Sequence, residues 1–156
     1  MKRIDEKLIA SVSIKAQQSS RLRMNLNFHD GDSDSCHRML NAIEPGSYIQ
    51  PHKHENPDKA EAFFSLKGRI AVVEFDDDGN ITDSIILDPS RGNFGAEVLP
   101  RTWHMIFSLD EGSVAYEVKH GPYDVSIDKK FASWAPAEGD EGVDTYLEEI
   151  RKKVLD

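Results

Sequence analysis

The sequence has little cysteine: Cys36 is the only one among 156 residues. A single cysteine excludes an internal disulfide, and nothing in the sequence indicates an oxidising compartment. Roles as a nucleophile or metal ligand stay open, but a lone cysteine in a strand-like run is typical of a small packed residue. We therefore expect Cys36 to be packed.

Long apolar runs are also absent. No stretch approaches the roughly 20 apolar residues of a membrane-spanning helix, so the sequence predicts no membrane segment. The first residues, MKRIDEKLIASVSIK, carry charge on both sides of a very short apolar run and lack the apolar region of a secretory signal. We expect a cytoplasmic protein.

Positive charge is scarce. The chain carries 28 acidic and 19 basic side chains, for a formal net charge of −9, and its only basic cluster is Arg151-Lys152-Lys153. Such a surface offers no extended face for a phosphate backbone. Nucleic acid is therefore not an expected partner.

Short strands separated by turn residues fill the middle of the chain. A length of 156 residues is typical of one domain. Regular spacing with Gly, Pro and Asp between the strands predicts an antiparallel sandwich or barrel, whose mouth can hold a ligand. The strands are expected at Cys36–Ile43, Glu61–Leu66, Arg69–Phe75, Ile81–Leu87, Ala96–Leu99, Trp103–Leu109 and Ser113–Lys119.

The run from Arg21 to His29 alternates strictly between polar and apolar residues, which predicts a two-faced strand. Its apolar face should point inward or lie under a helix. Its polar face could recognise a carboxylate, a phosphate or a sugar, or could be a solvated edge. The polar face consists of Arg21, Arg23, Asn25, Asn27 and His29.

The two ends of the chain predict helices. Asp5 is a possible N-cap for a short amphipathic helix over residues 4–14, and Asp144 for a C-terminal helix. Between the strands and the second helix, residues 121–142 are rich in Pro, Gly and acidic residues. We expect them to form a loop over the barrel. Burial of three side chains should anchor that loop: Phe131, Trp134 and Pro136.

A metal-binding pattern stands at His52 and His54. Residues two apart in a strand point to the same face, so the two imidazoles can lie side by side. Glu61 on the next strand and His104 would complete a set of three histidines and one glutamate for a divalent transition metal. Alternatively, the two histidines are surface polar residues of a strand.

These residues resemble the first motif of the cupin superfamily. Gly46, His52, His54, Glu61 and Gly68 fill its places, although the six residues between His54 and Glu61 make a longer gap than is usual. A looser second motif matches Gly95, Pro100 and His104.

More specifically, the chain resembles WbuC-type cupin-fold metalloproteins over nearly its whole length. The matching stretches are RLRMNLNFH, SYIQPHKH, Trp103-His104, EVKHGPY at 117–123 and FASWAP at 131–136. Relatives of this type occur among bacterial surface-polysaccharide genes.

The resemblance implies a mainly β fold, with a single double-stranded β-helix (cupin or jelly-roll) barrel and a short helix at each end. One cupin domain would cover residues 1–156. Its barrel core would span about 36–120, with the N-terminal helix and strand at 4–29 and the C-terminal loop and helix at 121–156. A homodimer is also expected, since cupin sheets often pair.

The resemblance further implies one divalent metal ion held by His52, His54, Glu61 and His104. Fe(II), Mn, Ni and Zn all tolerate these ligands. The histidines need partners for their other ring nitrogens. The candidates are Gln50, Asn25, Asn27 and Tyr116.

A reaction at the metal would need a general base and groups that hold the substrate. His29 and Tyr123 are the catalytic candidates; His120 is also available but is expected to be exposed, and Tyr123 could instead pack under the Trp134 loop. The candidates for substrate binding are Arg23, Asn25, Asn27 and Tyr116.

The predicted function is binding or conversion of a small polar, carbohydrate-like or anionic metabolite, such as a sugar derivative linked to surface-polysaccharide metabolism. A metal-dependent isomerase or an iron-dependent dioxygenase would have an open coordination position and a polar pocket containing Arg23 or His29. A non-catalytic, metal-stabilised binding or regulatory cupin would have a saturated metal or a pocket closed by the Trp134 segment.

Overall fold

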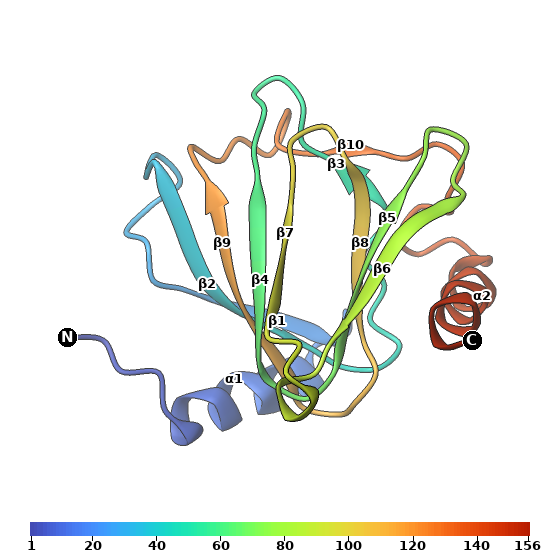
Figure 1. Ribbon diagram of the computed structural model, residues 1–156. Helices are drawn as coiled ribbons and strands as arrows, with labels where there is room; N and C mark the ends of the chain where they lie inside the picture. Colours follow the sequence, from blue (N-terminus) through green and yellow to red (C-terminus); the bar gives the residue numbers. More distant parts are fainter.

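The computed structural model describes residues 1–156 and consists mainly of two facing antiparallel sheets (Figure 1). The first sheet has the strand order β1-β2-β9-β4-β7 and the second β10-β3-β8-β5-β6. One helix stands at each end of the chain. The strands are β1 Arg23–Asn27, β2 Cys36–Ile43, β3 His52–Lys53, β4 Glu61–Lys67, β5 Ile70–Phe75, β6 Ile81–Leu87, β7 Gly95–Val98, β8 Trp103–Ser108, β9 Ser113–His120 and β10 Lys130–Phe131; the α-helices are α1 Glu6–Gln18 and α2 Val143–Leu155; a short 3-10 helix covers Pro89–Arg91.

The expected β-barrel is confirmed. Strands β2 and β6 begin and end at the predicted residues, β4, β5, β8 and β9 differ by one residue at one end, and β7 is shifted by one residue at both ends. Strand β1 is two residues shorter at each end than the predicted run from Arg21 to His29. This agreement arises because turns that contain Gly, Pro or Asp separate the strands.

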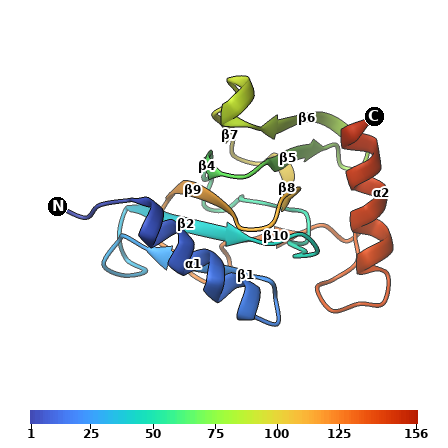
Figure 2. The same cartoon turned by 90° about the horizontal axis from the view of Figure 1, so that it is seen from below.

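Apolar side chains are buried in three separate layers. One cluster, which includes Ile43, Phe63 and Ile106, fills one end of the space between the sheets. The other two lie on the outer faces of the sheets, where α1 packs on the first sheet and α2 on the second (Figure 2). The helices therefore stabilise the barrel from outside.

Helix α1 begins after Asp5, as predicted, and the Asp5 carboxylate accepts a hydrogen bond of 2.9 Å from the Leu8 N–H. It runs to Gln18, beyond the expected end, because Val12 and Ala16 continue its buried face. Neither helix is long and apolar enough to cross a membrane.

The predicted cap of α2 is wrong. Gly142 occupies the N-cap position without a side-chain hydrogen bond, and Asp144 lies inside the first turn. The helix starts two residues earlier than this cap would place it, because Val143 packs against the apolar layer under α2. Asp144 still carries its charge at the favourable end of the helix dipole.

Strand β1 has the two faces that its sequence predicts. Leu26 and Phe28 pack in the apolar layer beneath α1. The polar side chains that alternate with them line a cavity, so they are not merely a solvated edge.

The segment 121–142 crosses the open end of the barrel, next to β3 in Figure 1. Its anchors agree only in part with those predicted, since Trp134 and Pro136 are partly buried but Phe131 is not. Phe131 is 53% exposed, because strand β10 pairs with β3, which places Phe131 opposite His52 and on the cavity side. Ala132 and Ala135 are buried instead, while Trp134 packs at 5.2 Å from the Phe75 ring.

Cys36 is exposed, which corrects the expectation that it is packed. It is the first residue of β2, on the same outer face as Leu40 and Ala42. Helix α1 covers those two residues, whereas Cys36 lies at the opposite end of the strand.

Gly68 separates β4 from β5 with a φ of +72°. A Cβ there would lie 3.0 Å from the Ser113 Cα, whereas a Cβ at Gly92, whose φ is +85°, would meet nothing within 4 Å. Gly92→Ala should therefore lower the free energy of unfolding by only about 1 kcal/mol, the cost of placing a residue with a Cβ in the left-handed conformation. Gly68→Ala should lose at least about 2 kcal/mol, because overpacking adds to that penalty. Urea unfolding of both variants measures the difference, and equal losses would contradict it.

Candidate metal centre

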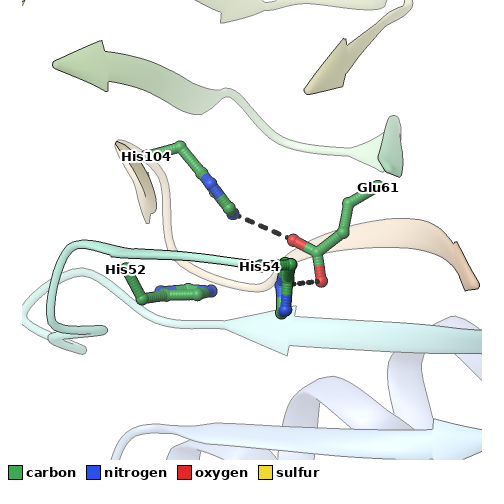
Figure 3. Close-up of side chains that lie close together, drawn as sticks. All are labelled: His52, His54, Glu61 and His104. Carbon is green, nitrogen blue, oxygen red and sulfur yellow. Dashed lines mark hydrogen bonds and ion pairs between the residues drawn. The ribbon is translucent and has the colours of Figure 1, made fainter. Parts of the chain in front are cut away.

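Four buried side chains converge from both sheets (Figure 3). His52 in β3 is the register partner of His104 in β8, and His54 follows β3 directly. Glu61 is the first residue of β4 in the facing sheet. The cluster therefore forms only when the two sheets close on each other.

The backbone fixes the orientation of each imidazole. The Nδ1 atoms of His52 and His104 lie 3.0 Å from the carbonyl oxygens of Gln50 and Thr102, and His54 Nδ1 contacts the carbonyl oxygen of Asp128. A carbonyl only accepts, so each Nδ1 carries a proton. In the neutral ring, Nε2 then presents its lone pair, which is how a histidine binds a metal.

Glu61 lies where the Nε2 atoms converge. Its two oxygens are 3.0 Å from His54 Nε2 and 2.9 Å from His104 Nε2, and the four ligand atoms lie within 4.8 Å of one another. The buried Nε2 atoms of His52 and His54 have no hydrogen-bond partner.

Lone pairs this close to a carboxylate repel it unless a proton or a metal cation lies between them. Ligands about 2.1 Å from one metal ion and at right angles would themselves lie about 3 Å apart. The spacing and the unpartnered nitrogens therefore fit a divalent metal.

Burial and neighbouring charge shift the proton affinities of these groups. Burial lowers the pKa of His52 well below its usual value, and the nearby Lys129 and His104 add to this, which favours the neutral ring. Burial acts to raise the pKa of Glu61, but the close contacts of its oxygens with the His104 and His54 rings outweigh burial, so the pKa lies well below its usual value. Neutral imidazoles and a carboxylate are the forms that bind metals.

A buried ionic network supports the cluster from the side of β9. Lys119 Nζ lies 3.5 Å from Glu61 and 2.9 Å from Asp128, and Lys59 Nζ lies 2.6 Å from Asp128. Burial would lower the pKa of Lys119, but Glu61, Glu117 and Asp128 raise it to about 12. Asp128 thus binds both lysines through its side chain and orients His54 through its backbone carbonyl.

A cavity of about 520 Å³ adjoins this cluster between the sheets. The four candidate ligands do not line it directly, but three residues that do line it contact them. Lys119 contacts Glu61, the Gln50 carbonyl accepts from His52, and the Phe131 ring lies 6.1 Å from the His52 ring. The cavity therefore borders the candidate metal centre.

Most of the predicted substrate-site residues lie around this cavity. It is lined by Arg23, Asn25, Asn27, His29 and Tyr123. Tyr123 is 37% exposed, and Lys119 Nζ lies 5.6 Å from the centre of its ring, so it does not pack under Trp134. His120 is exposed, as expected.

Tyr116 lies elsewhere, which corrects its assignment. Its ring is 6.0 Å from Phe28 in the layer beneath α1, because even-numbered residues of β9 point outward while Glu117 and Lys119 point inward. The predicted role of Gln50 also changes, since its backbone carbonyl holds His52 while its side-chain amide donates to Ala132 O at 3.0 Å.

Several cavity residues had not been predicted. His37 stacks on His29 with ring centres 4.0 Å apart, and the Asn41 amide donates to Glu117 at 2.9 Å. The alternation of β2 and β9 could have revealed these residues, because the odd positions of both strands face the cavity. Glu138, in an irregular segment, gave no such signal. The missed cavity residues are Asp32, His37, Met39, Asn41, Ile49, Glu117, Lys119, Lys129 and Glu138.

A family model described as "Domain of unknown function (DUF6016)" matches residues 4–87, more than half of the chain. The chain belongs to this family. A search of curated proteins finds no match for this DUF6016 protein.

Solved structures similar to this DUF6016 protein share its fold. TT1209 from Thermus thermophilus has 16% sequence identity and a TM-score of 0.55, over 78% of this chain and 98% of that one. L-ribose isomerase from Cellulomonas parahominis has 13% identity and a TM-score of 0.57, over 75% and 72%. KdgF from Halomonas sp. has 13% identity and a TM-score of 0.51, over 67% and 83%. Together with the two facing sheets, these neighbours confirm the cupin jelly-roll architecture.

Asp128→Asn should destabilise the protein by about 3 kcal/mol, because it leaves Lys59 and Lys119 buried without their shared anion. The matched control, Asp58→Asn, breaks an exposed pair with Arg101 and should lose less than about 1 kcal/mol. Urea unfolding at neutral pH measures both.

The effect of Asp128 should depend on pH. Burial acts to raise its pKa, but Lys119 and Lys59 hold the pKa below the unfolded value of 3.8. Its stabilising effect is therefore present above pH 3.8 and is lost as the pH falls through the lower folded pKa. If wild type still had a higher free energy of unfolding than Asp128→Asn at strongly acidic pH, this account would be contradicted.

Proposed function

We propose that this protein is a metal-dependent cupin of the WbuC type that binds or converts a small polar metabolite, such as a sugar derivative of surface-polysaccharide metabolism. The observation that carries the proposal is the convergence of imidazole Nε2 atoms on the buried Glu61 carboxylate. His52, His54, Glu61 and His104 would hold the ion. A bound divalent ion would act as a Lewis acid or lower the pKa of a bound water.

The cavity supports a polar ligand. Asn25, Asn27 and Asn41 present side-chain amides to it, and such groups pair well with hydroxyls. Lys119 touches both the cavity and Glu61, so it can stabilise negative charge on a ligand near the centre. His29 and His37 at the cavity wall can accept or donate a proton.

The neighbours are compatible with carbohydrate chemistry, since one of the similar structures is an L-ribose isomerase solved with L-psicose. The non-catalytic alternative predicts a pocket closed by the Trp134 segment. Trp134 itself packs against Phe75 and Trp103, but Phe131 and Glu138 of the same segment line the cavity, so this alternative stands beside the proposal. The iron-dependent dioxygenase alternative depends on which metal is bound.

Elemental analysis of protein purified without a histidine tag or chelator tests the proposal. Wild type should contain about one equivalent of a transition metal, and the His52→Ala/His54→Ala variant should contain almost none, because it loses half of the ligands. His120→Ala, at an exposed histidine, is the matched control and should keep the metal. Iron would favour oxygen chemistry, whereas zinc or manganese would favour isomerase or hydrolytic chemistry.

Chelation gives a second readout on the same proteins. Removing the metal should lower the melting temperature of wild type but not that of the double variant, because a ligand that binds only the folded state stabilises it. Absence of metal in wild type, together with failure to bind added Fe(II), Mn, Ni or Zn, would refute the proposal.

A further inference from the structure

An internal carboxylate occupies the arginine end of the cavity. Arg21 donates two hydrogen bonds of 2.7 Å to Glu138, one to each oxygen. The Nη2 atom of Arg23 lies 2.8 Å from both oxygens of the same side chain. All three residues line the cavity, although Glu138 is far from the arginines in sequence. Glu138 therefore shows how these two guanidinium groups bind a carboxylate.

Arg23 is held in place without help from Glu138. Its Nη1 donates to the carbonyl oxygen of Tyr48 at 3.0 Å and approaches Ser47 Oγ at 3.4 Å. Its side chain is only 12% exposed, so the guanidinium is held in one orientation and its other edge is directed at Glu138. Such a preorganised arginine recognises carboxylates well, because little conformational freedom is lost on binding.

Glu138 is less buried than Arg23. Its side chain is 39% exposed and belongs to residues 137–142, all of which are exposed. Its hydrogen bonds with Arg21 lower its pKa to about 2 against the opposing effect of burial, so it is ionised at neutral pH. An anion from solution can replace it without breaking up a packed core.

The rest of the cavity indicates what such an anion carries. The amides of Asn25, Asn27 and Asn41 suit hydroxyl groups. Ile49 and Gln50 form the part of the cavity wall between the arginine end and the candidate metal centre, because they lie in the chain between Tyr48, which binds Arg23, and His52. We infer that the ligand is a small polyhydroxylated carboxylic acid whose carboxylate binds Arg21 and Arg23 in place of Glu138. This inference rests on the proposed function, because it assigns the substrate class of the same cavity.

Isothermal titration with D-glucuronate tests the inference on the metal-loaded protein. Glu138→Gln should bind D-glucuronate about tenfold more tightly than wild type, because the neutral amide no longer competes for the arginines and the open state becomes dominant. The matched control is Glu141→Gln, at an exposed residue of the same segment that makes no hydrogen bond, and it should bind as wild type does. D-glucose should bind no more tightly to Glu138→Gln than to wild type.

The arginines are tested in the Glu138→Gln background. Adding Arg21→Ala should weaken D-glucuronate binding at least tenfold, because two charge-assisted hydrogen bonds are lost. Arg21 is 61% exposed, so this change should leave the fold intact. Arg23→Lys is a second variant, which keeps the charge but loses the forked geometry, and it should also weaken binding.

The inference is overturned if D-glucuronate binds neither wild type nor Glu138→Gln, or if Glu138→Gln does not bind it more tightly than wild type does. D-glucose 6-phosphate distinguishes a carboxylate subsite from a phosphate subsite. If Glu138→Gln binds only this compound more tightly than wild type does, the subsite takes phosphate and the assignment to a carboxylate is overturned. Repeating the titrations after chelation separates this inference from the metal. An effect of Glu138→Gln in protein that binds no metal would support the subsite while the proposed function failed.

Discussion

The structure depends on placing a carboxylate among three imidazoles inside a closed barrel. Glu61 comes from one sheet and the three histidines from the other, so neither sheet can form the cluster alone. Burying a carboxylate is unfavourable unless positive charge compensates it. Lys119 Nζ, 3.5 Å from Glu61, supplies part of this charge. Backbone carbonyls at each Nδ1 direct the Nε2 lone pairs inward, so the imidazoles themselves compensate the carboxylate only when they hold protons or a metal ion. Folding and metal binding are coupled in such a site.

The barrel accommodates this polar centre by placing much of its apolar packing elsewhere. Between the sheets, only one end is filled by apolar residues such as Phe63 and Ile106. The outer faces carry further apolar layers, one beneath α1 and a larger one beneath α2. Burial on these outer faces stabilises the fold by the hydrophobic effect. The other end of the interior is therefore available for a water-accessible cavity and charged side chains.

Strict periodicity explains which features the sequence predicted well. The alternation over residues 21–29 predicted both faces of β1, and the His-x-His spacing identified the side chains that converge with Glu61 and His104. Prediction failed where pairing with a distant segment decides the orientation. Tyr116 points outward because of the register of β9, and Phe131 faces the cavity because β10 pairs with β3. Glu138 lies in an irregular segment, where periodicity carries no information.

The segment 121–142 contacts the site at both ends but is held very differently at each. Near its start, Asp128 is buried, binds two lysines and orients His54 through its backbone. Near its end, Glu138 reaches the arginines from an exposed stretch. The buried anchor Ala132 and Trp134, packed on the outer layer, lie between these two points. Packed residues thus separate Glu138 from the candidate metal ligands, so displacement of Glu138 by a ligand at the arginines would leave the imidazole geometry fixed.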